Sequence, residues 1–138
     1  MSRPVPLASS IQAESARLAA ACTACGACVE ACPMPDFAGL APAAPTAVAA
    51  GMRAALRGEP VSPEGLAWVG ACTRSGQCNA ACPEALDVAL MLRLAGMRLK
   101  GALGEPPRLP VPGDAGWAAR VKAFARMTLT EEEQTRWL

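Results

Sequence analysis

The sequence predicts a mainly α-helical protein. Several segments carry signals for the start and the end of a helix, two runs of closely spaced cysteines lie between them, and a proline-rich stretch precedes the last segments. A chain of 138 residues suits one domain with an appended tail. We expect a domain over residues 1–101, followed over residues 102–138 by a Pro-rich linker and a short helical docking tail.

Two helices are expected around the first cysteine run. One covers Ser9–Ala21 and leads into that run. After a loop rich in Pro and Ala, the other begins near Thr46, whose hydroxyl can cap the first turn, and continues to Arg57. Gly58 then acts as a stop, because glycine readily adopts the left-handed conformation that ends many helices.

Two more helices are expected around the second cysteine run. Ser62 and Pro63 form a helix start, with serine as the cap and proline in the first turn, and this short helix leads to Cys72. Asp87 can cap a helix over residues 88–100. That segment is apolar nearly all round, so either the tail or another subunit should cover it, and we favour a subunit interface.

The tail is expected to contain two short helices. Residues 105–113 are rich in proline and cannot continue a helix. Beyond them, Asp114–Arg126 and Thr130–Leu138 are the predicted segments, and Thr130 with Glu133 three residues later forms a capping box.

Composition excludes several classes of site. The chain has no histidine, which removes imidazole metal ligands, His-containing catalytic triads and Rieske centres. The formal net charge of +1 gives no indication of a nucleic-acid partner, and no apolar run approaches the roughly 20 residues of a membrane span. Seven cysteines in closely spaced runs favour metal ligation over disulfides, and the N-terminal residues do not read as a signal peptide. We therefore expect a cytoplasmic protein.

The first cysteine run, residues 22–33, reads C-T-A-C-G-A-C-V-E-A-C-P. This spacing is typical of bacterial two-cluster ferredoxins, in which the fourth cysteine of each run binds the other cluster. Gly26 and Ala27 are small, so their backbone amides could approach the sulfurs. Structural zinc is the alternative that a single C-x2-C motif would leave open. We assign to one 4Fe–4S cluster the residues Cys22, Cys25, Cys28 and Cys82.

The second cysteine run, residues 72–83, reads C-T-R-S-G-Q-C-N-A-A-C-P and has Ser75 where the first run has a cysteine. We assign its cluster three thiolates, from Cys32, Cys72 and Cys78. Three thiolates suit a 3Fe–4S cluster. Alternatively, Ser75 as an alkoxide, a water molecule or a partner residue could complete a 4Fe–4S cluster, or the site could be vestigial.

Over about residues 21–101, the chain resembles the small, C-type iron–sulfur subunit of heterodisulfide reductases. It resembles more loosely the C-terminal half of the iron–sulfur subunits of succinate dehydrogenase and fumarate reductase. The resemblance rests on the two cysteine runs, on Trp68 ahead of Cys72, and on the C-P-E-A-L-D-V sequence of residues 82–88. The heterodisulfide reductase protein normally has cysteine at position 75, whereas the succinate dehydrogenase subunits lack it and hold a 3Fe–4S cluster there. That comparison ranks 3Fe–4S first for the second cluster.

The resemblance implies an alpha-helical ferredoxin with two iron–sulfur clusters. It further implies an electron-transfer subunit of a cytoplasmic oxidoreductase complex, relaying electrons between a flavoprotein or a heterodisulfide reductase B-like subunit and another acceptor. We therefore expect a hetero-oligomer. The chain carries no candidate general base, so we expect no catalytic residues of its own. The alternatives are a free-standing soluble ferredoxin and an iron or redox sensor with a labile cluster at Ser75.

Overall fold

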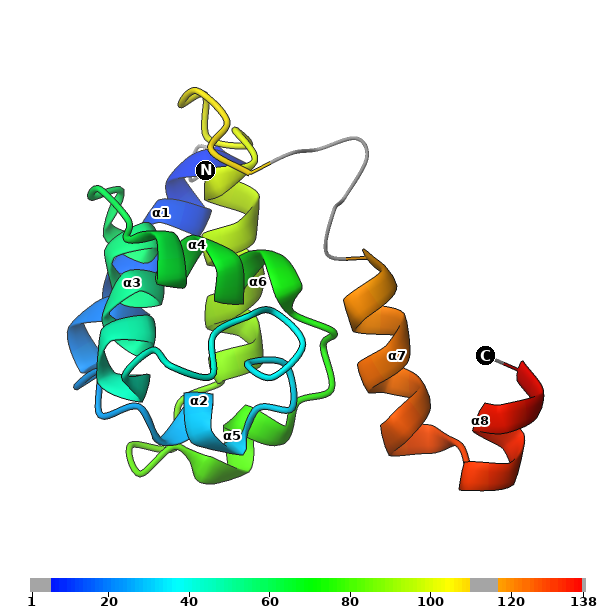
Figure 1. Cartoon of the computed structure of the whole chain (residues 1–138). Helices are drawn as coiled ribbons and strands as arrows, with labels where there is room; N and C mark the ends of the chain where they lie inside the picture. The colour runs from blue at the N-terminus through cyan, green and yellow to red at the C-terminus, as the bar shows by residue number, and fades with distance from the viewer. Residues whose placement is uncertain (1–5, 110–116, 138) are drawn as a thin grey trace, which may run out of the picture.

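The computed structural model describes residues 6–109 and 117–137, and the described residues form helices and loops with no β-strand (Figure 1). The prediction of a mainly α-helical protein is therefore confirmed. In chain order the helices are α1 (Leu7–Ala21), α2 (Ala27–Ala31), α3 (Pro45–Arg57), α4 (Pro63–Ala71), α5 (Gln77–Ala81), α6 (Val88–Leu99), α7 (Trp117–Thr128) and α8 (Glu131–Trp137).

The helix boundaries follow local capping signals. At the start of α4, Ser62 Oγ accepts a hydrogen bond from the Gly65 N–H at 3.2 Å. At the start of α6, Asp87 Oδ1 accepts one from the Leu90 N–H at 3.0 Å. At the start of α8, the predicted capping box is present: the Thr130 N–H donates to Glu133 Oε2 at 2.8 Å and the Glu133 N–H donates to Thr130 Oγ1 at 3.2 Å. Each cap satisfies amide groups that the first helical turn leaves without an intrahelical partner.

Two expected boundaries need comment. Thr46 does not cap α3, because Pro45 already occupies the first helical turn and Ala44 takes the capping position without a side-chain bond. Proline suits that place because its fixed φ matches the helix and it has no N–H that would need a partner. In the tail, residues 114–116 of the expected penultimate helix and residue 138 of the last one lie outside the described residues, and the described parts form α7 and α8.

The first six helices form two structural repeats. The second cysteine run starts 50 residues after the first (position 72 against 22), and α5 lies at the same distance in sequence from α2. In space, α2 packs on α5 and α3 packs on α6, while α1 and α4 each contact both α3 and α6 (Figure 1). The two cysteine runs are thereby brought together at one end of the helices.

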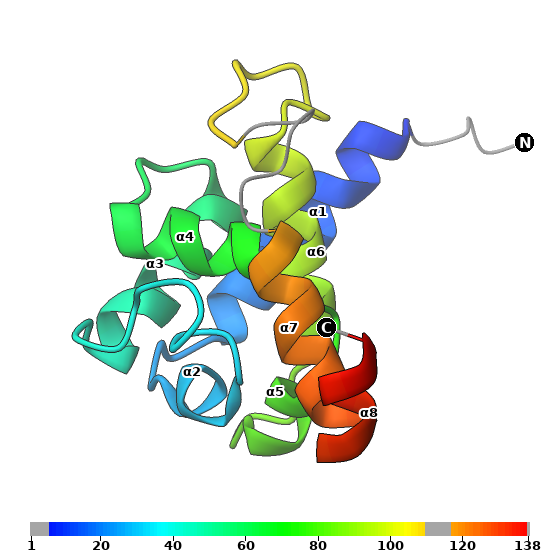
Figure 2. The same ribbon diagram turned by 45° about the vertical axis from the view of Figure 1, so that its right-hand side comes forward.

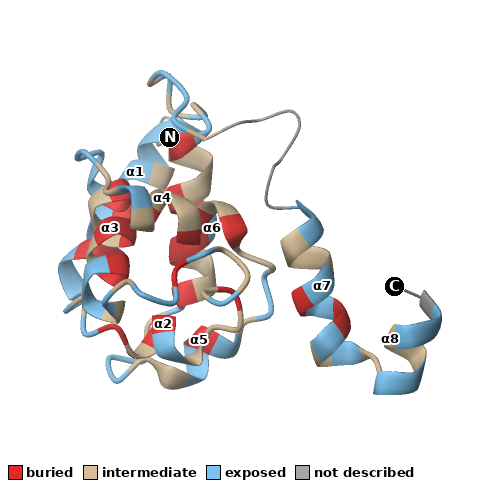
Figure 3. Ribbon diagram, in the orientation of Figure 1, coloured by how far each residue is buried: buried red, intermediate tan, exposed pale blue. Residues whose placement is uncertain are grey.

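The core lies between the two repeats. Buried side chains gather on the inward faces of α3, α4 and α6 (Figure 3). The apolar α6 was expected to be covered by the tail or by another subunit. The helix packs on α1, α3, α4 and α5, which cover most of its apolar side chains, while Leu90 and Met97 are half-buried and Arg93 is exposed. The subunit interface stays a prediction. A central helix of a small bundle needs an apolar surface on several sides, which a single amphipathic face does not provide.

Helices α3 and α4 approach each other very closely at two glycines. A Cβ atom built on Gly51 would lie 2.6 Å from the Cα of Gly65, and one built on Gly65 would lie 2.7 Å from the Cα of Gly51. Only residues without a side chain fit at this crossing. The contact holds the helix that follows the first cysteine run against the helix that precedes the second.

The tail returns to the domain through α7. Ala123 is buried against Met34 and Ala71, and Arg120 Nη1 donates a hydrogen bond to the Gly70 carbonyl at 2.7 Å. The guanidinium of Arg126 also lies 5.2 Å from the centre of the Phe37 ring. Figure 2 shows α7 alongside the first six helices, and α8 contacts α7. Among the described residues, no helix combines the length and the hydropathy that crossing a bilayer requires.

Candidate metal centres

The two cysteine runs have the same backbone conformation. In each, the residue two positions after the first cysteine has a positive φ, 54° at Ala24 and 64° at Arg74, and a left-handed glycine follows, Gly26 or Gly76. Positive φ at residues other than glycine is uncommon and costs energy, and such strain is concentrated at functional sites. The duplication seen in the sequence therefore extends to the shape of the loops.

This conformation turns one backbone amide toward a sulfur in each run. The Ala24 N–H lies 3.4 Å from Cys22 Sγ, and the Arg74 N–H lies 3.4 Å from Cys72 Sγ. We expected the amides of Gly26 and Ala27 to approach the sulfurs, but the described contact comes from Ala24. Gly26 provides room instead, because a Cβ on it would lie 2.8 Å from backbone atoms at the start of α3.

Four cysteines line one cavity at the first site. Cys22, Cys25 and Cys28 come from the first run, and Cys82 comes from the end of the second. The cavity opens to solvent, and its inner wall is apolar, with Met52 and Met91 from α3 and α6. The fold thus brings together the four residues that the sequence pattern groups. The four thiols surround a space, which suits a centre of several metal atoms that binds one thiolate at each corner.

Burial controls the protonation of Cys28. It raises the pKa of Cys28 to about 12, and the nearby thiols of Cys22, Cys78 and Cys25 add to the effect. A thiol with such a pKa is protonated at neutral pH, and a metal must displace that proton when it binds. Because Cys78 belongs to the other set, the same interaction shows that the two sets of cysteines are neighbours.

Three cysteines are brought together at the second site. Burial raises the pKa of Cys78 to about 11, and the neighbouring thiols of Cys32 and Cys72 raise it further. Burial also raises the pKa of Cys32, with a smaller contribution in the same direction from Cys72. The trio matches the second set predicted from the sequence. The three thiols come from two distant segments. Cys32 lies at the end of α2, and Cys72 and Cys78 lie on either side of the second loop.

Ser75 occupies the position in the second loop that Cys25 occupies in the first. Both side chains are exposed, and they lie on loops of the same conformation. No hydrogen bond to Ser75 is described. The hydroxyl of Ser75 therefore stands in the second loop where the thiol of Cys25 stands in the first. It has no protein partner among the described contacts.

Trp68 lies beside the second site, to which the sequence analysis did not assign it. The residue is 1% exposed. Burial has the largest effect on the pKa of Cys32 and raises it, while the nearby Trp68 side chain and Met34 backbone lower it. The signal available in the sequence was a tryptophan four residues before Cys72, because a buried indole N–H needs an acceptor.

A small polar network holds the second loop to α6. Asn79 Nδ2 donates to Asp87 Oδ1 at 3.0 Å, and the Ala89 N–H donates to Asn79 Oδ1 at 2.9 Å. On the first loop, Arg53 from α3 donates to the Cys22 carbonyl at 3.1 Å. These contacts hold the first cysteine run against α3 and the second against α6. They were not evident from the cysteine spacing.

No group of three or more acidic or cysteine side chains among the described residues is spaced to hold a single metal ion. The thiols stand around a cavity at the first site and as a neighbouring trio at the second. Both donor sets consist of sulfur alone, the ligand type that iron–sulfur clusters use.

Comparison with known proteins agrees with this chemistry. Residues 21–87 match the model of a family described as the 4Fe-4S dicluster domain. Searches among curated proteins and among solved structures find no match. The matched segment runs from the last residue of α1 to the cap of α6 and includes all seven cysteines. Residues 21–87 of this chain are therefore similar to a ferredoxin-like iron–sulfur domain.

Proposed function

We propose that this protein is the electron-transfer subunit of an oxidoreductase complex, in which it relays electrons between a flavoprotein or catalytic subunit and a second acceptor. The observation that carries the proposal is the cavity lined by Cys22, Cys25, Cys28 and Cys82, which draws ligands from both cysteine runs. Such crossing of ligands is the arrangement of two-cluster ferredoxins. The resemblance to the small iron–sulfur protein of heterodisulfide reductases favours a B-like catalytic subunit as one partner.

The proposed ligands follow the two sets of cysteines. A 4Fe–4S cluster would be held by Cys22, Cys25, Cys28 and Cys82. The second cluster would be held by Cys32, Cys72 and Cys78, with 3Fe–4S as the first choice. Bound iron–sulfur clusters take up and release single electrons without making or breaking covalent bonds in the chain.

Residues of the chain exclude water from the first site and bring the two sites close together. Met52 and Met91 line the inner wall of the first cavity, so that they exclude water from its inner side. The side chain of Trp68 lies beside Cys32 and lowers the pKa of its thiol, which favours negative charge at the second site. Cys28 and Cys78 are close enough for their charges to interact, so an electron has a short path from one ligand set to the other. Seven thiols serving as metal ligands suit the reducing cytoplasm, which we propose as the location.

The first test is anaerobic purification followed by iron and sulfide analysis and EPR of the oxidised and reduced protein. We expect about seven irons per chain and a nearly isotropic signal in the oxidised state, as one 4Fe–4S and one 3Fe–4S cluster require. About eight irons without that signal would mean two 4Fe–4S clusters and would overturn the three-iron assignment. Iron without sulfide, or zinc, would overturn the proposed function as a whole.

Replacing Ser75 tests the fourth corner directly. Because Ser75 stands where the first loop has Cys25, Ser75→Cys should convert the oxidised second cluster from 3Fe–4S to 4Fe–4S and remove the isotropic signal. An unchanged spectrum would contradict this placement of position 75.

A sensor is the second candidate function, and the exposure of Ser75 is the observation that favours it. An exposed corner could lose and regain iron as the iron supply changes. Reversible interconversion of the two cluster types on adding and removing ferrous iron, together with a partner that binds only one of the two forms, would favour the sensor over the relay.

A further inference from the structure

The surface beside the second site is strongly cationic. A hollow there is lined by Cys72 and by four basic side chains, and no carboxylate of the described residues contributes to it; the four are Arg74, Arg93, Lys100 and Arg120. Two further hollows adjoin it and share Arg74 with it, one toward α6 and one toward α7. Because the whole chain has a net charge of only +1, this concentration of positive charge is local.

Most of these cations are available to a partner. Arg74, Arg93 and Lys100 are exposed, and no ion pair is described for any of them. Arg120 differs, since its Nη1 donates to the Gly70 carbonyl and fixes α7 beside the hollow. The single carboxylate lining the adjoining hollow, Asp87, accepts hydrogen bonds from Asn79 and the Leu90 amide. It therefore already serves as a helix cap.

Exposed aromatic side chains lie next to the cations. Trp117 is 63% exposed and Phe124 is 56% exposed, and both line the hollow that also contains Cys72 and Arg74. Tryptophan, phenylalanine and arginine are enriched at protein–protein interfaces, where they provide most of the binding free energy. The combination points to a protein partner, since a small anion would make no use of two aromatic rings at the edge of the site.

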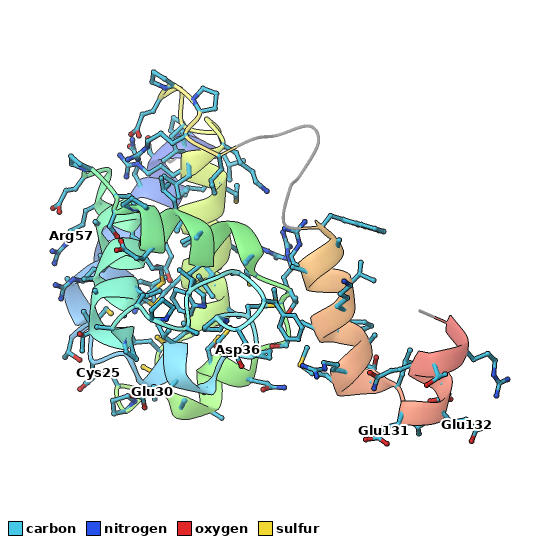
Figure 4. The ribbon with its side chains drawn as sticks, in the orientation of Figure 1. Cys25, Glu30, Asp36, Arg57, Glu131 and Glu132 are labelled. Carbon is cyan, nitrogen blue, oxygen red and sulfur yellow. The ribbon has the colours of Figure 1, made fainter. Side chains whose placement is uncertain are left out.

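The first site has a different rim. Among the residues that the structure describes, Glu84 is the one charged residue that lines its cavity, and Figure 4 shows Cys25 and Glu30 along the same lower edge of the domain. The two candidate centres therefore face surroundings of different charge. Opposite charges at the two ends would direct different partners to the two clusters.

From these observations we infer that the cationic surface around Cys72 is the docking site of an acidic redox protein, which exchanges one electron with the second cluster. The inference rests on the proposed function, because it needs a cluster at Cys32, Cys72 and Cys78. In the exchange the partner loses one electron and the second centre gains it, or the reverse, and no bond is formed or broken. Positive charge on this surface raises the rate of encounter with a negatively charged partner and places it beside Cys72.

The experiment uses the anaerobically purified holoprotein and reduced flavodoxin, an acidic one-electron flavoprotein, as the probe. Stopped-flow absorbance gives the bimolecular rate constant between ionic strengths of about 0.01 M and about 0.15 M, over which the screening length falls from about 30 Å to about 8 Å. We expect the rate constant of the natural protein to fall roughly tenfold or more over this range.

Two substitutions that change the net charge equally distinguish an effect of the cationic surface from an effect of the overall charge. Arg93→Glu alters the cationic surface, while Arg57→Glu alters an exposed arginine at the end of α3 that lines none of the hollows (Figure 4). Arg93→Glu should slow electron transfer roughly tenfold at low ionic strength, and Arg57→Glu should change it by less than about twofold. Arg74→Gln, which keeps the backbone contact to Cys72 Sγ, should give a smaller loss in the same direction. Unchanged EPR spectra would show that the variants keep their clusters.

Equal losses from Arg93→Glu and Arg57→Glu, or a rate constant that does not depend on salt, would overturn the docking surface. Binding to vesicles containing phosphatidylserine that Arg93→Glu abolishes, with no change in the flavodoxin reaction, would assign the surface to an anionic membrane and also overturn the inference. Failure of the proposed function is a separate result. In that case dithionite itself would reduce no iron–sulfur centre in the natural protein.

Discussion

Trp68 and Cys32 show how one side chain can make two similar sites different. Trp68 lies beside Cys32, which belongs to the second set of thiols, and lowers the pKa of that thiol. The corresponding residue of the first repeat, 50 positions earlier, is Leu18, which is buried but has no hydrogen to donate. A donor to a ligand sulfur stabilises the reduced, more negative state and so raises the reduction potential.

Replacement of Trp68 by phenylalanine should therefore lower the potential of the second cluster. A hydrogen bond worth about 1 kcal/mol corresponds to roughly 40 mV for a one-electron couple. An EPR-monitored redox titration measures the change. Trp117→Phe is the matched control, since Trp117 is exposed on α7, and it should leave both potentials unchanged. If Trp68→Phe left the second potential at its natural value, the hydrogen bond would have no influence on the cluster.

The buried thiols make cluster assembly depend on pH. Burial raises the pKa of Cys28 to about 12 and that of Cys78 to about 11, so both are protonated at pH 8. Because metal binding requires thiolates, reconstitution of the apoprotein should release these protons, and cluster affinity should rise with pH toward those values. A pH-stat records the protons released at pH 8. An apoprotein that bound its clusters without releasing protons would contradict the raised pKa values.

At the scale of the helices, the contact between α3 and α4 is the most constrained. Gly51 and Gly65 lie so close that a methyl group on either would meet the backbone of the other. By helix propensity alone, alanine should stabilise each helix by about 1 kcal/mol relative to glycine. The close contact between α3 and α4 makes glycine, and not alanine, the favoured residue at both positions.

We expect Gly65→Ala to destabilise the protein by about 1–3 kcal/mol, the usual cost of adding a methyl group to a packed interior. Gly96→Ala in α6 is the control, because the nearest atom to its new methyl group is a Val69 side-chain carbon at 3.7 Å. It should be neutral or stabilising. The midpoint of thermal unfolding of the holoprotein measures both, and a Gly65→Ala variant as stable as the natural protein would show that the two helices can separate at little cost.

At the scale of the whole molecule, the tail is held to the domain by a small contact. Ala123 is buried against Met34 and Ala71, and it lies on the same helix as the exposed aromatic residues beside Cys72. The placement of α7 thus forms one wall of the cationic surface.

A charge at Ala123 should detach α7. Ala123→Asp would bury a carboxylate without a partner, which costs well over the roughly 1.4 kcal/mol of a tenfold change in an equilibrium. Trypsin cleavage in α7, which carries Arg120, Lys122 and Arg126, should become at least about tenfold faster. Ala118→Asp, at an exposed position of the same helix, should cleave at the natural rate. Equal cleavage of the two variants would mean that α7 is not held by this contact.

Much of the fold was predictable from local signals. Ser62, Asp87 and Thr130 cap their helices as expected, because capping depends on neighbours within a few residues. The capping role given to Thr46 in α3 was wrong, since two signals, a threonine and a proline, competed within one turn. The packing of α6 among the other helices was not predicted, because an apolar helix at the centre of a bundle and one at a subunit interface have the same composition.

The sequence by itself determined the chemistry of this protein. The spacing of seven cysteines predicted the two sets of thiols, because three ligands of a cluster lie on one short loop and the fourth must come from a distant segment. Only the tertiary structure decided what surrounds them. Burial sets the pKa values of Cys28 and Cys78, α4 carries Trp68 to Cys32, and the packing of α6 and α7 gathers basic side chains beside Cys72. Those properties depend on contacts between residues far apart in the chain, and no local pattern records such contacts.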